Sequence, residues 1–296
     1  MINSTKGQTR LSSRLGALSL LTIALVFGAA STPASAAVPQ WLTTSNSTAN
    51  YVALGDSFTS GQGAPSYLIS SGTCHQSKYG SYPVITASLS SFKLAANESC
   101  SGASTTAVQA QVDALPIQLT GAKSPIRLVT LTVGGIDAGS DQVLAACAPN
   151  PDPITNPSCA TAILYAQMQL STGALVPQLA TTYAKVATAM PNARVVVLTY
   201  PRLFNPNVSP LGNTFNTATD ALNANITAAV ASAKVQGYKV QLVDVTQEFA
   251  NHGIGAPIPY ISYDPTNLSA LANFHPNLLG NTFGYFQALV NNRVLR

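Results

Sequence analysis

The sequence predicts an α/β protein in which helices cover both faces of a mostly parallel sheet. Two observations indicate this fold class. Short apolar runs suited to buried strands are separated by Ala-rich segments whose apolar residues recur at helical spacing. This alternation continues along the chain without an internal repeat. Strands that alternate with helices form parallel sheets, because each crossover connection passes over a face of the sheet.

The expected strands and helices alternate along the chain, and the first element is a strand. The five strands are expected at about Asn50–Leu54, Phe92–Ala96, Ile126–Val133, Ala193–Thr199 and Val240–Val245. The helices are expected at about Tyr82–Ser91, from the turn Cys100–Thr106 through Leu115, at 160–190, at 214–236 and at Leu278–Val294. Right-handed crossovers leave few topologies, and we expect the strand order 2-1-3-4-5. The carboxyl ends of strands one and three would then border one crevice.

The first 36 residues are typical of a secretory signal peptide. Lys6, Arg10 and Arg14 give a basic start, Leu15–Ala30 is apolar and uncharged, and Ala34-Ser35-Ala36 has the small-residue pattern of a cleavage site. The apolar stretch is short for a membrane span. We therefore expect a signal peptide at 1–36, one domain at 37–296 and a secreted protein.

The charge of the remaining chain argues against a polyanionic partner. Three of the 14 basic residues and none of the 10 acidic ones lie in the leader, so the net charge falls from +4 to +1. We expect no nucleic-acid partner and no anionic membrane partner. No second long apolar run follows, so the mature chain is expected to have no transmembrane segment. We also expect it to be a monomer.

Four cysteines indicate two disulfides in an exported protein. Three connectivities are possible, and we expect Cys74–Cys100 and Cys147–Cys159 because each pair lies in a local, loop-rich segment. A zinc site is the rival interpretation. The chain has no Cys-x-x-Cys and three histidines, so no metal and no cofactor are expected.

Ser57 is the first candidate nucleophile. It follows the strand at 50–54 in the stretch Gly55-Asp56-Ser57, which would place it at the carboxyl edge of the sheet with a helix N-terminus behind it. The alternative is that Asp56 and Ser57 merely cap a helix.

A serine hydroxyl needs a base, and the chain offers three histidines. His75 lies beside Cys74 in a loop, and His252 lies in a Gly-rich turn. His275 follows the last strand and precedes the last helix, so its loop emerges at the same edge as Ser57. We therefore expect His275 to be the partner of Ser57.

Four short motifs resemble those of the SGNH (GDSL) hydrolases. They are Gly55-Asp56-Ser57, Gly102 in a Ser-Gly-Ala-Ser turn, Gly134-Gly135-Ile136-Asp137, and the His-Pro-Asn-x-x-Gly that begins at His275. Their order and spacing are similar to the secreted bacterial lipase/esterase branch, and the resemblance covers nearly all of the mature chain.

The resemblance implies a three-layer, flavodoxin-like fold and hydrolysis of carboxylic esters, from small molecules or lipids, without a cofactor. Ser57 would attack the ester carbonyl and form an acyl-enzyme, with His275 as the base. The backbone N–H groups of Ser57 and Gly102 would form the oxyanion hole.

The chain departs from the family pattern at Ile136. Family members have an asparagine there whose amide completes the oxyanion hole, and isoleucine cannot donate a hydrogen bond. Asn273 or Asn277 could replace that donor. Alternatively, the protein is a catalytically impaired binding protein of the cell envelope, or an acyltransferase that uses the same serine.

A second departure concerns the group that orients the imidazole. The family usually has Asp three residues before its histidine, and Ala272 occupies that position. We expect the backbone carbonyl of Ala272 to accept the Nδ1 proton. Asp264 and Asp137 are the acidic alternatives, although Asp137 could simply brace its turn.

Overall fold

A five-stranded parallel sheet forms the centre of the protein. The computed structural model describes residues 50–147 and 154–296, so the predicted signal peptide lies outside the described residues. The described residues belong to one compact unit, Val38–Arg296. The strands are β1 (Asn50–Gly55), β2 (Lys93–Asn97), β3 (Ile126–Thr132), β4 (Arg194–Leu198) and β5 (Val240–Val243). Their order, β2-β1-β3-β4-β5, confirms the predicted topology.

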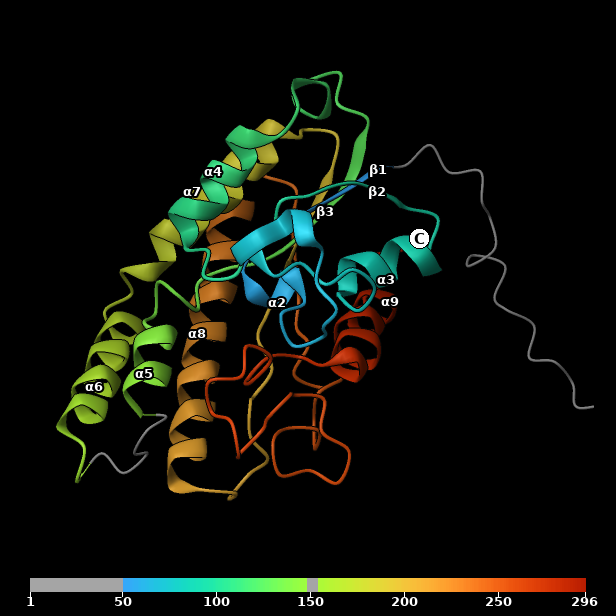
Figure 1. Ribbon diagram of the computed structural model, residues 1–296. Helices are drawn as coiled ribbons and strands as arrows, with labels where there is room; N and C mark the ends of the chain where they lie inside the picture. Colours follow the sequence, from blue (N-terminus) through green and yellow to red (C-terminus); the bar gives the residue numbers. More distant parts are fainter. Residues whose placement is uncertain (1–49, 148–153) are drawn as a thin grey trace, which may run out of the picture. The chain divides into compact units, whose positions relative to one another are not determined.

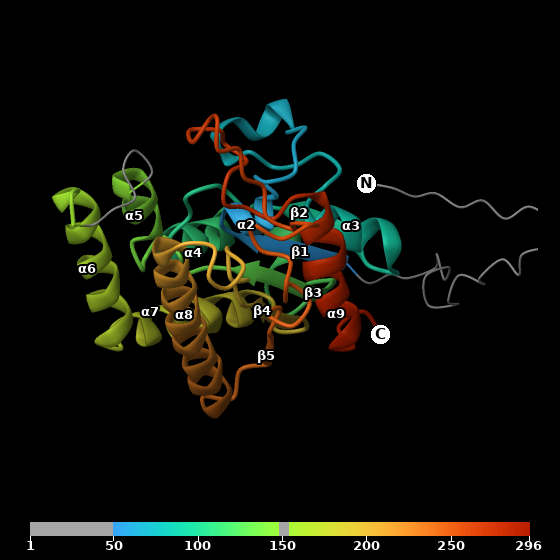
Figure 2. The same cartoon turned by 90° about the horizontal axis from the view of Figure 1, so that it is seen from below.

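Helices lie on both faces of this sheet (Figures 1 and 2). Successive strand residues point to opposite faces. Val52 and Leu54 of β1 face a core packed by α4 (Thr105–Ala114), α7 (Leu175–Ala189) and α8 (Pro210–Val235). Tyr51 and Ala53 face the other core, packed by α3 (Tyr82–Leu89) and the C-terminal helix. The fold is therefore the three-layer α/β arrangement that the sequence predicts.

The remaining helices complete the described structure. They are α2 (Ser57–Ser60), α5 (Ser140–Cys147), α6 (Pro157–Ser171), α9 (Gln287–Asn291), two 3-10 helices (Ile69–Cys74 and Ile117–Leu119) and a π-helix (Gly280–Phe286). Within the described ranges, no helix is both long and apolar enough to cross a membrane.

Two helix predictions are wrong in detail. The segment 160–190 forms two helices, because the chain turns between α6 and α7 at Gly173, whose φ is +71°. The segment Leu278–Val294 begins with the π-helix before α9, where Gly284 lies against the ring of Phe249. A side chain at Gly284 would overlap that ring, so tertiary packing decides this geometry rather than helix propensity.

The carboxyl ends of β1 and β3 meet directly. Gly55 pairs with Thr132 at the last position of the ladder, and the amide of Asp56 donates to the carbonyl of Thr132 at 3.1 Å. The turn after β1 and the turn that begins at Gly134 therefore open at the same edge of the sheet.

Candidate active site

The backbone before Ser57 is held in place from two sides. Gly55 has φ +126°, and a Cβ there would lie 2.5 Å from the carbonyl of Thr132, so only glycine fits. The side-chain amide of Gln111 on α4 accepts from the Gly55 N–H at 2.8 Å and donates to its carbonyl at 2.9 Å. Ser57 then begins α2, with its side chain at the carboxyl edge of the sheet.

Asp56 caps α2 and anchors the turn. Its carboxylate accepts from the amide of Phe58 at 3.0 Å, from the hydroxyl of Thr132 at 2.7 Å and from the phenol of Tyr200. Burial raises the pKa of Asp56 to about 6, and these hydrogen bonds act in the opposite direction. The capping interpretation thus holds for Asp56, while the Ser57 hydroxyl is left for another partner.

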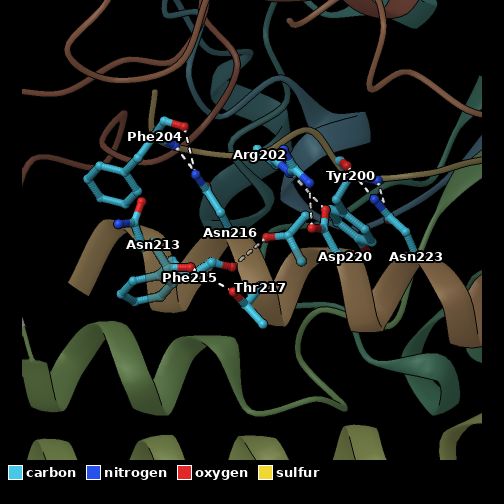
Figure 3. A network of polar contacts seen from close by, with 10 residues as sticks. Tyr200, Arg202, Phe204, Asn213, Phe215, Asn216, Thr217, Asp220 and Asn223 are labelled. Carbon is cyan, nitrogen blue, oxygen red and sulfur yellow. Dashed lines mark hydrogen bonds and ion pairs between the residues drawn. The ribbon is translucent and has the colours of Figure 1, made fainter. Parts of the chain in front are cut away.

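Tyr200 is held in turn by α8, as Figure 3 shows. The amide of Asn223 accepts from the N–H of Tyr200 at 2.9 Å and donates to its carbonyl at 2.8 Å. Asn216 makes the same pair of bonds with Phe204, at 3.2 and 2.8 Å. The chain after β4 is therefore fixed along one side of α8.

An ion pair between the two amides also connects the chain after β4 to α8. Arg202 donates to the carboxylate of Asp220 at 2.9 and 2.6 Å (Figure 3). Both side chains are about half exposed, so this pair contributes little to the free energy of unfolding. Asn223 fixes the backbone of Tyr200, and the buried phenol donates to Asp56.

The loop that carries His275 packs closely on the segment after α2. A Cβ at Gly63 would lie 2.6 Å from the carbonyl oxygen of His275, so glycine allows the two backbones to approach. The side chain of Gln62 donates to the carbonyl of Leu271 at 2.7 Å, and the hydroxyl of Ser262 donates to that of Gly63 at 3.0 Å. The two hydrogen bonds join residues 209 and 199 positions apart in the sequence.

Ser57 and His275 are in direct contact. The Ser57 Oγ lies 2.8 Å from the Nε2 atom of His275, and the Nδ1 atom lies 2.7 Å from the carbonyl oxygen of Asn273. A carbonyl can only accept, so Nδ1 carries the proton and Nε2 accepts from the serine hydroxyl. Burial lowers the pKa of His275 to about 4, so the imidazole is neutral at pH 7 and free to take a proton.

The expected contact with Ala272 is wrong. The carbonyl of Ala272 accepts from the backbone N–H of His275 at 3.3 Å, within a turn. Phe274 has φ +63°, and this left-handed residue turns the chain so that the carbonyl of Asn273 lies at the ring. The orienting group is therefore a backbone carbonyl, as expected, but it comes one residue later.

Neither acidic alternative contacts the imidazole. Both carboxylate oxygens of Asp137 accept from the amide of Thr105, at 3.1 and 2.9 Å, and one also accepts from the Thr105 hydroxyl. Asp137 thus braces the start of α4. Asp264 accepts from the amide and the hydroxyl of Thr266 in an exposed turn, which lowers the pKa of its carboxyl group.

The other two histidines lie in structural surroundings. The ring of His75 packs against Tyr67, with centroids 5.4 Å apart. His252 stacks on Tyr260 at 3.8 Å, and its Nδ1 lies 2.8 Å from the carbonyl oxygen of Ile258. Among the residues that the structure describes, no group of three or more His, Cys, Asp or Glu side chains is arranged to hold a metal ion.

An apolar cavity opens beside Ser57 and His275. Its volume is about 690 Å³, and both residues line it together with Gly102. Apolar side chains of α5, α6 and α8 form much of its wall, among them Val143, Ile163, Leu170, Phe215 and Leu222. The cavity therefore has the size and apolar lining typical of a small-ligand site.

The motifs and this geometry agree with a comparison with known proteins. The sequence profile of the GDSL-like lipase/acylhydrolase family matches residues 53–283. The chain belongs to this family. The predicted SGNH (GDSL) resemblance is thus confirmed, and membership supports a carboxylic ester hydrolase.

Relatives in the GDSL-like family come from streptomycetes. A lipase of Streptomyces rimosus is 33% identical over 284 residues, which are 95% of this chain and 98% of that protein. The crystal structure of an extracellular lipase from S. rimosus matches with a TM-score of 0.70 and 30% identity, over 82% of this chain and 99% of that one. Phospholipase A1 of Streptomyces albidoflavus NA297 matches with a TM-score of 0.67 and 30% identity, over 83% and 99%.

Two residues that line the cavity of this GDSL-family chain, Ser57 and Gly102, have backbone N–H groups without an acceptor among the described residues. Ser57 is the first residue of α2, so its N–H has no partner within the helix. Gly102 has φ +77° and open space where a Cβ would be. Neither N–H has a hydrogen-bond acceptor among the residues described here. Both are available to an oxygen atom of a ligand.

Neither of the two suggested amides, Asn273 and Asn277, lines the cavity. Ile136 lines the cavity. The amide nitrogen of Asn273 donates to the carbonyl of Asn267 at 2.9 Å, and that of Asn277 donates to the carbonyl of Pro259 at 2.9 Å. The suggestion that Asn273 or Asn277 replaces the missing donor gains no support, because each amide donates to a loop carbonyl and neither lines the cavity.

Both predicted disulfides are confirmed, and both lie close to the site. Cys74–Cys100 holds the turn that contains Gly102, and Cys147–Cys159 joins α5 to α6. Two disulfides, together with the extracellular relative, are consistent with secretion. The second bridge fastens two helices that form a wall of the cavity.

Sequence reasoning missed Tyr200 and the role of the Asn273 carbonyl. Tyr200 directly follows β4 at the carboxyl edge, and that position was a signal for a residue near the site. The carbonyl of Asn273 gave no such signal, because any residue supplies the same group.

Proposed function

We propose that this protein is a secreted serine hydrolase of carboxylic esters that works through an acyl-enzyme on Ser57. The observation that carries the proposal is the 2.8 Å contact between Ser57 Oγ and His275 Nε2. A serine hydroxyl becomes an effective nucleophile when a neutral imidazole accepts its proton during attack.

The reaction follows from the protons at this contact. Ser57 Oγ bonds to the ester carbonyl carbon as its proton passes to His275 Nε2. The tetrahedral intermediate then collapses, and His275 returns the proton to the departing alkoxide, which leaves as an alcohol. A water molecule attacks the acyl-enzyme with His275 again as base, and this releases the carboxylic acid and the free serine.

The carbonyl of Asn273 orients the base. It holds the Nδ1 proton at 2.7 Å and so keeps Nε2 unprotonated toward Ser57. A carbonyl stabilises an imidazolium less than a carboxylate would. Ser57 and His275 therefore work as a catalytic dyad, and a backbone carbonyl orients the imidazole.

Two backbone donors would stabilise the oxyanion. Ser57 and Gly102 line the cavity, neither N–H has an acceptor within the described residues, and the side chain of Ile136 cannot supply a third donor. One oxyanion donor typically contributes about 10²–10³ in kcat. We therefore expect measurable ester turnover, with a kcat limited by incomplete stabilisation of the oxyanion.

The cavity favours esters with an apolar acyl group. Its wall of α5, α6 and α8 side chains offers a place for a hydrocarbon chain beside Ser57, with a volume of about 690 Å³. Burial of each CH₂ group contributes about 0.8 kcal/mol. Longer acyl chains should therefore lower KM until the cavity is filled.

The test is a hydrolysis profile across p-nitrophenyl esters of increasing acyl length, run beside Ser57→Ala. We expect turnover by the native protein, with KM falling as the chain lengthens, and none by a folded Ser57→Ala variant. Equal, negligible rates for both proteins would favour the binding-protein alternative. Transesterified product in the presence of a competing alcohol would favour the acyltransferase.

A further inference from the structure

Exposed apolar side chains are concentrated on both sides of His275. Within residues 258–283, six large apolar side chains are between 38% and 59% exposed. We call these the apolar rim: Ile258, Tyr263, Leu268, Leu271, Leu278 and Phe283. In Figure 1 their segment forms the orange and red loops below the sheet and the start of the red helix.

Backbone pairing places the two halves of the rim beside His275. The amide of Ser262 donates to the carbonyl of His275 at 2.8 Å, and that of Phe274 donates back to Ser262 at 2.8 Å. At the other end, the amide of Asn277 donates to the carbonyl of Tyr260 at 2.9 Å. The chain segments that carry Ile258 and Leu278 therefore leave this short ladder at one end, and Tyr263 lies at the other.

The rim is continuous with the cavity wall at two points. The ring of Tyr263 packs on Phe274 with centroids 5.5 Å apart, and Phe274 lines the cavity. The carbonyl of Leu271 accepts from Gln62, which also lines the cavity. An apolar ligand held by the rim would thus lie at the entrance to the site.

The rim carries almost no charge. Between Ile254 and Asn292, Asp264 is the single residue of the types Asp, Glu, Lys and Arg. The basic residues Arg127, Arg194, Lys239 and Arg296 instead surround a hollow at the amino ends of the strands. An anionic surface would attract that opposite edge, whereas the rim suits a surface without net charge.

Exposed apolar side chains gathered in one place usually mark an interaction surface. Each large aliphatic side chain that leaves water contributes about 1.5–3 kcal/mol on full burial, so even partial insertion of several gives measurable binding. A lipid surface fits because it needs no shape complementarity and it supplies the ester to the adjoining cavity.

We propose that the apolar rim docks the protein on an electrically neutral lipid–water surface, so that Ser57 meets its ester substrate at the interface. This proposal rests on the proposed ester-hydrolase function. It predicts a binding step that is separable from chemistry, that depends on the rim and that is insensitive to ionic strength.

The experiment measures sedimentation with phosphatidylcholine vesicles in the Ser57→Ala background, where no substrate is consumed. The rim variant is Ile258→Asp with Leu278→Asp, at the two most exposed rim positions. The matched control is Ile117→Asp with Val235→Asp, which alters side chains 84% and 89% exposed that lie just before β3 and β5. Turnover of a soluble short-chain ester is measured for the same pairs with Ser57 intact.

We expect the rim variant to bind vesicles about tenfold or more weakly, with soluble-ester turnover within about twofold of the native value. The control should bind like the parent protein, and 0.5 M salt should not weaken binding. Three results would overturn the proposal. The parent protein could fail to bind phosphatidylcholine vesicles, the control variant could lose as much vesicle binding as the rim variant, or binding could require anionic lipid. Rim-dependent self-association without vesicle binding would also overturn it, in favour of a second copy as occupant.

A replacement variant and one further result keep the docking proposal separate from the hydrolase proposal. If the aspartate pair unfolds, Ile258→Ser with Leu278→Ser takes its place, and thermal melting checks the fold. Rim-dependent vesicle binding by a protein that hydrolyses no soluble ester would contradict the hydrolase proposal and leave the docking surface standing.

Discussion

The two edges of the sheet use their side chains in different ways. At the carboxyl edge, Ser57 and His275 meet beside an apolar cavity, and backbone N–H groups remain without acceptors. At the amino edge, Arg127, Arg194 and Lys239 surround a shallow hollow of about 590 Å³. Both edges contain a cavity, so a hollow alone does not identify a functional site.

Two of the basic side chains at the amino edge, Arg127 and Arg194, donate to backbone carbonyls of the protein itself. The guanidinium of Arg194 donates to the carbonyls of Arg293 and Val294, and that of Arg127 donates to Ser124 and Ile126 at 3.1 Å. Burial lowers the pKa of Arg194 below its usual range. Arg194 thus fastens the C-terminal segment at the amino edge. The carboxyl edge instead keeps reactive groups free, as in parallel α/β sheets generally.

Loss of the bridge between α5 and α6 should have the largest effect on the carboxyl edge. Cys147 and Cys159 lie in a small apolar cluster outside the two main cores. We expect Cys147→Ser with Cys159→Ser to lower the free energy of unfolding by about 3 kcal/mol. Denaturant melts measure this loss, and turnover of long-chain esters should fall more than that of short-chain esters. Unchanged melts would show that the cluster alone holds the wall.

Ile136→Asn should strengthen the site. The new amide would face the cavity and add a third oxyanion donor, so we expect kcat to rise by up to about 10²-fold with little change in KM. Steady-state kinetics on one soluble ester measure the change, with Ile136→Leu as the matched control. An unaltered kcat would mean that another group already supplies this interaction.

The pH profile should report the burial of His275. Protonated imidazole cannot accept the Ser57 proton, and the pKa of His275 is lowered to about 4. We therefore expect kcat/KM to be constant above about pH 5 and to fall roughly tenfold per unit below pH 4. Circular dichroism at each pH verifies the fold. A midpoint near 6.5, the ordinary value for histidine, would indicate a solvated ring.

A substitution at the amino edge should leave chemistry intact. Arg194→Gln removes a charged donor from two backbone carbonyls, and we expect a loss of about 1 kcal/mol in the free energy of unfolding. Turnover of a soluble ester should stay within about twofold of the native rate. A tenfold loss of kcat in a fully folded variant would abolish the distinction between the two edges.

Much of the fold was predictable because its signals are local. Strands such as Ile126–Thr132 are short apolar runs, and the alternation with helices implies a parallel sheet. Sheet polarity then places the turns after β1 and β3 at one edge. The meeting of Ser57 and His275 follows from this topology, since both lie in connections that leave that edge.

The remaining parts depend on contacts that no local pattern encodes. Phe274 adopts φ +63°, which is uncommon for a phenylalanine, and this turn selects the carbonyl of Asn273 over that of Ala272. The bond between Tyr200 and Asp56 joins residues 144 positions apart. The sequence shows that Ile136 departs from the family pattern. Only the coordinates show that the amides of Asn273 and Asn277 bond to loop carbonyls.

The central claim is that Ser57 is a nucleophile activated by His275. Labelling with a fluorophosphonate probe, followed by mass spectrometry of the modified peptide, tests it most directly. We predict one modified residue, Ser57, with labelling absent in Ser57→Ala and at least about 10²-fold slower in a folded His275→Ala variant. Labelling at another residue, or labelling of Ser57 at the native rate without His275, would contradict the account.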